Sequence, residues 1–86
     1  MLSLHDILVQ RAHEVYATGS YTVEFHAAST RVNTLLSLLE LAESRLRVAC
    51  ELAAITDDLR PVVAAATLRD HRARDVEAAI EVMRLA

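Results

Sequence analysis

The sequence predicts an all-α protein of three helices, at about residues 3–18, 20–56 and 58–85, in a single domain over residues 1–86. Its 86 residues include one Gly and one Pro, too few turn residues for a sandwich or a barrel. Hydrophobic residues make up 53% of the chain, which is too apolar for disorder. The stretch 21–55 has neither Gly nor Pro and carries apolar residues at helical spacing. These observations favour a long central helix.

The first helix is predicted from its two ends. Ser3 is a suitable cap, and Asp6 three residues later completes a capping box with Asp in place of Glu. Gly19 follows Thr18 and is expected in the left-handed conformation that ends many helices. One apolar stripe lies between them: Leu4, Leu8, Ala12 and Val15.

The second helix is expected to start near Ser20 or Tyr21 and to run to about Ile55. Ser29 and Thr30 compete for backbone hydrogen bonds and could open or kink it, but we favour one continuous element. Its first apolar stripe alternates in steps of four and three, the spacing of a helix packed nearly parallel to a neighbour. The stripe consists of Tyr21, Phe25, Ala28, Val32, Leu35, Leu39, Ala42, Leu46, Ala49 and Ala53.

A second apolar stripe lies about 100° round the same helix. Its members are Leu38, Leu41, Val48, Leu52 and Ile55, with Arg45 as the one charged residue. A helix that is apolar on two sides cannot be satisfied by one neighbour, so this helix is predicted to be central.

The third helix is expected from about Leu59 to Leu85. Asp57 or Asp58 can cap it, and Pro61 is tolerated in a first turn. Its apolar stripe is interrupted by Arg69 and contains Val62, Ala66, Ala73, Val76, Ile80 and Met83.

The predicted lengths indicate a partner. A helix over 21–55 would be roughly 50 Å long, whereas a compact chain of this size has a diameter near 30 Å. The first helix, at roughly 22 Å, covers less than half of the second stripe. We therefore expect a homodimer in which helices two and three of each chain form a four-helix bundle, with helix one packed over an end. The alternative is a monomeric three-helix bundle whose second helix breaks near Ser29 and Thr30.

Net charge and composition restrict the partner and the compartment. The formal net charge is −3, which does not favour nucleic acid or an anionic membrane. Cys50 is the one cysteine, which fits a reducing compartment, and we interpret it as a small core or seam residue. We expect neither a signal peptide nor a membrane span, and hence a cytoplasmic protein.

No residue pattern indicates an enzyme, a metal site or a cofactor. His5 and His13 are eight residues apart, roughly 12 Å along a helix, so they cannot reach one ion together. No nucleophile has a base at helical spacing, and Cys50 has no neighbouring His to activate it.

Arginines mark the most charged part of the chain. Arg69 and Arg72 lie on or beside the stripe of the third helix, where they could pair with Glu40, Glu43 or Glu51 of the same chain or of its mate. The alternative is a small anionic ligand or an enzyme site between the helices of a dimer, lined by Arg45, Arg69 and Arg72.

The predicted function is a non-enzymatic, helical protein–protein interaction module. It would act as a small adaptor or inhibitor, for example of the phage or mobile-element type, by binding a larger protein. The residues predicted at the interface are Leu38, Leu41, Arg45, Val48, Leu52, Ile55, Arg69 and Arg72.

Overall fold

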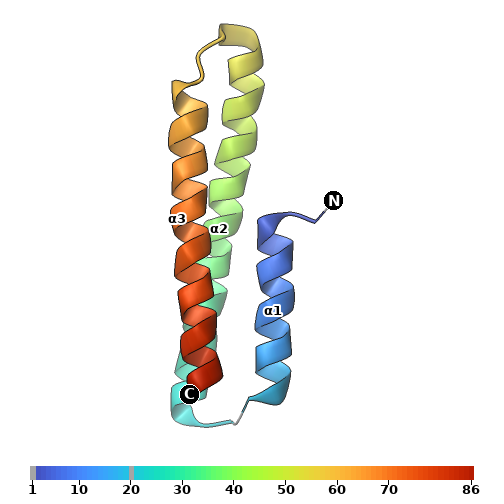
Figure 1. The fold of residues 1–86 in the computed structure, drawn as a ribbon, viewed down its shortest axis with the longest axis vertical. Helices are drawn as coiled ribbons and strands as arrows, with labels where there is room; N and C mark the ends of the chain where they lie inside the picture. Colours follow the sequence, from blue (N-terminus) through green and yellow to red (C-terminus); the bar gives the residue numbers. More distant parts are fainter. Residues whose placement is uncertain (1, 20) are drawn as a thin grey trace.

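The computed structural model describes residues 2–19 and 21–86 and contains the three predicted helices. They are α1 (Leu4–Thr18), α2 (Val23–Thr56) and α3 (Arg60–Leu85). α2 and α3 form a long antiparallel hairpin, and α1 lies beside the half of the hairpin that is remote from its turn (Figure 1). The radius of gyration is 15.2 Å and the principal extents are 51 × 21 × 13 Å, so α2 extends beyond a compact domain as predicted.

α1 begins with the expected capping box. The Ser3 hydroxyl accepts a hydrogen bond from the Asp6 amide at 3.1 Å, and the Asp6 carboxylate accepts one from the Ser3 amide at 3.4 Å. The predicted left-handed Gly19 is wrong, because its φ of −78° and ψ of 160° are extended. Glycine is instead required by space, since an added Cβ would lie 2.1 Å from the ring of Phe25.

α2 is continuous, which confirms the prediction of one long element. The Thr30 hydroxyl donates to the His26 carbonyl at 3.1 Å, so this side chain bonds within the helix without breaking it. The expected start at Tyr21 is wrong: Thr22 caps the helix by accepting from the Phe25 amide at 3.0 Å, and the helix begins at Val23. The other expected start, Ser20, lies outside the described residues.

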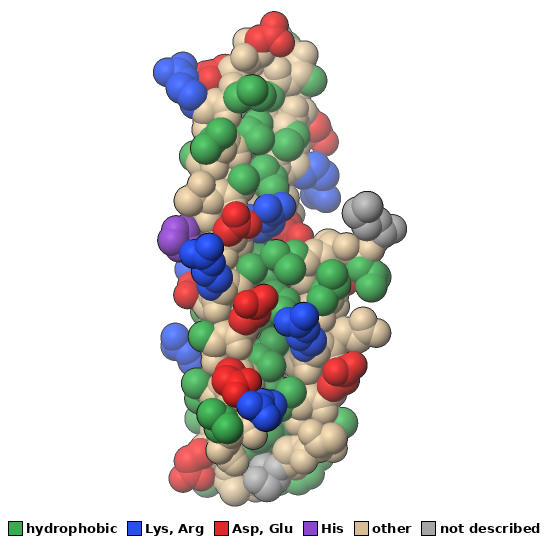
Figure 2. Space-filling model, viewed as in Figure 1, with side chains coloured by type: hydrophobic (Ala, Val, Ile, Leu, Met, Phe, Trp, Pro, Cys, Tyr) green, Lys and Arg blue, Asp and Glu red, His purple; other side chains and the backbone are tan. Residues whose placement is uncertain are grey.

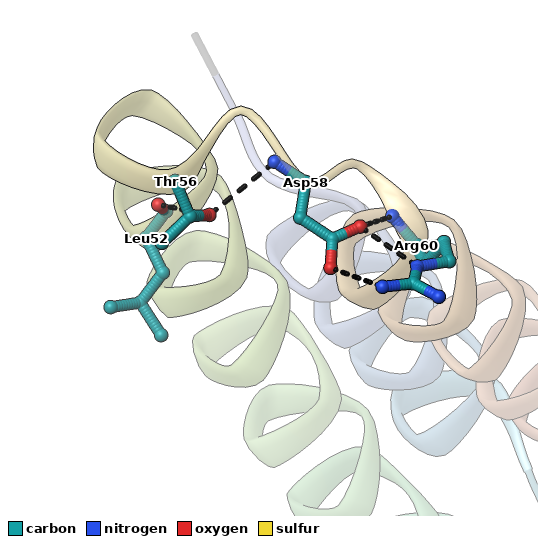
Figure 3. Close-up of polar contacts among 4 residues, drawn as sticks. All are labelled: Leu52, Thr56, Asp58 and Arg60. Atoms are coloured by element: carbon teal, nitrogen blue, oxygen red, sulfur yellow. Dashed lines mark hydrogen bonds and ion pairs between the residues drawn. The ribbon is translucent and has the colours of Figure 1, made fainter.

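The turn between α2 and α3 is held by short polar contacts (Figure 3). Asp57 adopts the left-handed conformation, with φ 58° and ψ 14°, and its amide donates to the Ala53 carbonyl at 2.9 Å. Asp58 accepts from the Arg60 amide at 3.1 Å and from its guanidinium at 3.0 Å. The prediction that Asp57 or Asp58 is the N-cap residue of α3 is wrong, because Leu59 occupies the N-cap position and makes no side-chain capping hydrogen bond. Pro61 lies in the first turn of α3, as expected.

The buried core lies in the half of the hairpin that α1 covers. It consists of Leu8, Ala12, Phe25, Val32, Leu36, Leu39, Ala73, Val76, Ala79, Ile80 and Met83. Among described residues between 40 and 72, the buried hydrophobic side chains are those of Ala42 and Ala49 alone. The half of the hairpin near the turn therefore has no fully buried large side chain, and Leu46, Val62 and Leu68 are only half-buried there.

Candidate protein interface

The uncovered half of the hairpin, formed by α2 beyond about Ser44 and α3 before about Arg72, is the candidate functional surface. α1 begins level with Glu40, since the His5 Nε2 lies 3.9 Å from the Glu40 Oε2. Beyond that point the ribbon shows α2 and α3 without a third helix (Figure 1). Figure 2 shows hydrophobic side chains gathered over this half and charged side chains alternating over the covered half, on the face in view.

A groove runs along α2 beside the start of α3. Its volume is about 350 Å³, and we refer to it as the α2 groove. The residues that line it are Leu41, Ser44, Arg45, Val48, Ala49, Leu52 and Pro61. The second predicted stripe supplies four of the seven residues, counting its charged member Arg45.

The apolar side chains of this stripe are largely exposed. Leu41 is 59% exposed, Val48 50%, and Leu52 54%. Ile55 is 81% exposed, and Leu38 is half-buried. Single exposed apolar residues are ordinary on protein surfaces, but a contiguous line of them marks an interaction site.

The α2 groove and α1 lie on different faces of α2. The start of α1 packs beside Glu40 and Arg47, which line a hollow shared with Ser3 and His5. At 100° per residue, Leu41 and Val48 lie about 100° further round the helix than Glu40 and Arg47. A molecule in the α2 groove would therefore not collide with α1.

The three predicted arginines are not gathered into one site. Arg45 lines the α2 groove, but Arg69 and Arg72 do not. The Arg69 guanidinium donates to Asp70, its neighbour in sequence, at 3.0 Å, rather than to Glu40, Glu43 or Glu51. Arg45 and Arg72 form no ion pair with any residue that the structure describes.

Cys50 is exposed, so its interpretation as a core residue is wrong, whereas a place in the seam between two helices of different chains stays a prediction. It lies fourteen residues after Leu36 and hence on nearly the same side of α2. Leu36 is buried in the covered half, whereas Cys50 lies beyond the start of α1. The same face of the helix is therefore covered at one end and open at the other.

Two exposed ion pairs shift pKa values without forming a chemical site. Hydrogen bonds from the Arg60 side chain, and then from its amide, lower the pKa of Asp58, and the pair raises the pKa of Arg60. A hydrogen bond from Arg84 likewise lowers the pKa of Glu81. Both arginines already carry a positive charge at neutral pH, so these shifts prepare neither pair for proton transfer.

The described residues bring together no group of three His, Cys, Asp or Glu side chains that could hold a metal ion. The His5 Nδ1 lies 3.8 Å from the Asp6 Oδ1 and the His5 Nε2 lies 3.9 Å from the Glu40 Oε2, so the two carboxylates approach opposite nitrogens of the ring and do not converge with it on one ion. Within the same residues, no helix combines the length and the apolar run needed to cross a bilayer.

Sequence reasoning missed part of this surface. Pro61 was interpreted as a helix-start residue, yet its ring also lines the α2 groove. Leu59 and Val63 are each 64% exposed beside the turn. Pro61, Leu68 and Asp75 are spaced by seven residues, so they lie near one face of α3. This spacing is the sequence signal that could have placed Pro61 on the exposed surface.

Comparisons with protein-family models, with curated proteins and with solved structures gave no match.

Proposed function

We propose that the protein is a non-enzymatic, helical protein–protein interaction module that pairs with a second copy of itself through the α2 groove. The observation that carries the proposal is the exposed line of Leu41, Val48, Leu52 and Ile55 on a half of the hairpin without a large buried side chain. A second copy supplies helices of the right length and chemistry. Two hairpins packed face to face form a four-helix bundle, in which these residues become central.

The available area supports a dimer. The four exposed side chains offer roughly 400 Å² of apolar surface per chain, so two copies bury about 800 Å² before polar residues are counted. Specific interfaces bury about 1,000 Å² or more in total, and the residues that flank the stripe supply the remainder. α1 stays on the outer surface of each chain, where it is available to a further protein. A role as a small adaptor or inhibitor of a larger protein depends on that outer surface.

An anionic ligand is the alternative occupant of the α2 groove. Its volume of about 350 Å³ falls in the range of small-molecule sites, and Arg45 would supply the charge. Arg69 already pairs with Asp70, and neither it nor Arg72 lines the groove. The arrangement thus offers one cation along an apolar surface, which suits a helix better than a charged metabolite.

The first test is the molar mass in solution, by light scattering after size exclusion, over at least a tenfold range of concentration. We expect a dimer for the wild type and a folded monomer for Val48→Glu, because the dimer would bury an unpaired carboxylate. Val63→Glu is the matched control. Val63 is also an exposed valine near the turn, but it lies about 200° round α3 from Pro61 and hence away from the groove.

A monomeric wild type at the highest concentration would refute self-association. Equal dissociation of the dimer by both variants would show that the α2 groove is not the contact surface.

A further inference from the structure

The two long helices carry opposite unpaired charges on the face that contains the α2 groove. Arg45 lines the groove, and Asp75 lies fourteen residues after Pro61, hence within about 40° of it round α3. Both side chains are exposed, and neither forms an ion pair with a described residue. His71 and Arg72 precede Asp75 by one turn of its own helix, but neither lies within ion-pair distance of it in the described contacts.

The hairpin fixes the relative heights of these residues. Residues equally far from the turn are level, because α2 ends at Thr56 and α3 begins at Arg60. Arg45 is therefore level with His71, and Asp75 is one turn lower, about 6 Å along the axis. An arginine side chain is long enough to cover that offset.

We propose that the second copy is related to the first by a twofold axis parallel to α2 and α3, so that Arg45 of each chain pairs with the partner's Asp75. This inference rests on the proposed self-association and specifies its geometry. In that arrangement α2 of one chain lies over α3 of the other at the same height. The dimer then has two such pairs, one on each side of the axis, and each chain contributes Arg45 to one pair and Asp75 to the other.

Val48 and Ile55 fit the same arrangement, while Leu41 is level with the partner's Asp75 and would pack beside the stem of that side chain. Val48 is level with the partner's Leu68, and Ile55 is level with the partner's Pro61. The overlap also covers Val82, which is 59% exposed and lies seven residues after Asp75 on the same face of α3. The other symmetric arrangement, with the axis perpendicular to the helices, places α2 over α2 near the turns. It leaves Val82 uncovered and gives Arg45 no contact with the partner's Asp75.

The test exchanges the two charges. Arg45→Glu alone places two carboxylates together at each pair, and Asp75→Arg alone places two guanidinium groups together, so each variant should raise the dimer dissociation constant at least tenfold. Mixed in equal amounts, they can form a heterodimer with one native pair and one reversed pair. Native mass spectrometry should then show the heterodimer in large excess over either homodimer.

Arg74→Glu is the matched control, because Arg74 is the exposed neighbour of Asp75 and lies about 100° round the helix from it. It should change the dissociation constant by less than about twofold. Because the exchanged side chains are exposed in the single chain, circular dichroism should show unchanged helix content for every variant.

The outcomes separate the two proposals. If Val48→Glu gives a monomer while Arg45→Glu and Asp75→Arg dimerise as tightly as the wild type, self-association stands and the proposed axis is overturned. A mixture without preference for the heterodimer would also overturn the axis. If the wild type is monomeric, both proposals fail.

Discussion

Replacing Gly19 by alanine should destabilise the protein although the backbone there tolerates any residue. The φ of −78° and ψ of 160° are ordinary for alanine. The added Cβ, however, would lie 2.1, 2.3 and 2.9 Å from three ring atoms of Phe25, where carbon atoms normally approach to about 3.5 to 4.0 Å. Phe25 is 2% exposed, so its ring has little room to retreat.

The cost of this overpacking should be about 1 to 3 kcal/mol. Each kcal/mol lowers the melting temperature of a domain this size by about 4 to 8 °C. Tyr16 and Tyr21 surround the ring, with centroids 5.7 and 6.3 Å from that of Phe25, so a displaced ring also disturbs both tyrosines. Denaturant unfolding followed by circular dichroism, at one protein concentration for all variants, measures the free energy of unfolding.

The matched control is a double-mutant cycle. In a Phe25→Ala background the ring is absent, so Gly19→Ala should cost close to nothing. If Gly19→Ala lowered the free energy of unfolding equally in both backgrounds, or did not lower it in the wild type, the steric explanation would be refuted.

Two further predictions concern the turn and the ion pairs. Asp57→Gly should stabilise the protein by about 0.5 to 1 kcal/mol in denaturant unfolding, because the left-handed Asp57 carries a side-chain penalty that glycine lacks; a destabilised variant would contradict this. By NMR titration, Asp58 and Glu81 should ionise below their ordinary pKa values of 3.8 and 4.5, and Arg60→Gln and Arg84→Gln should return each pKa upward. Because both folded pKa values are lowered, the stabilisation by these pairs is present above the ordinary pKa and disappears as the pH falls through the lowered one; unchanged midpoints in the variants would contradict the assignment.

The length and continuity of α2 could be predicted from sequence because they depend on local properties. A stretch without Gly or Pro can form one helix, and Leu39 of its first stripe is buried as expected for a helix packed along a neighbour. The expectation that the first helix covers part of the second stripe is wrong, because α1 packs on another face of α2. The alternative of a break at Ser29 and Thr30 is excluded by the continuous helix.

Other features depend on which neighbour a residue meets and could not be predicted locally. Gly19 resembled a helix-ending residue, but its role depends on the ring of Phe25, six residues away. Cys50 is a small apolar residue of the type often found in cores. It is exposed because α1 begins level with Glu40 and does not extend as far as Cys50. Arg69 pairs with its sequence neighbour Asp70 and not with the glutamates of α2. A contact within one helix does not depend on the distance between two helices.

The uneven core implies that the two ends of the hairpin open at different rates. Backbone amides near Leu39 and Val76 lie among large buried side chains, so their hydrogen exchange requires unfolding of the whole protein. Amides near Leu52 and Val63 lack such packing and exchange through local fraying from the turn. A second copy on this end would have to dissociate before the end could fray, so the protection of these amides would rise with protein concentration. The protection of the covered half would rise with it, because dimerisation also stabilises the native chain against global unfolding.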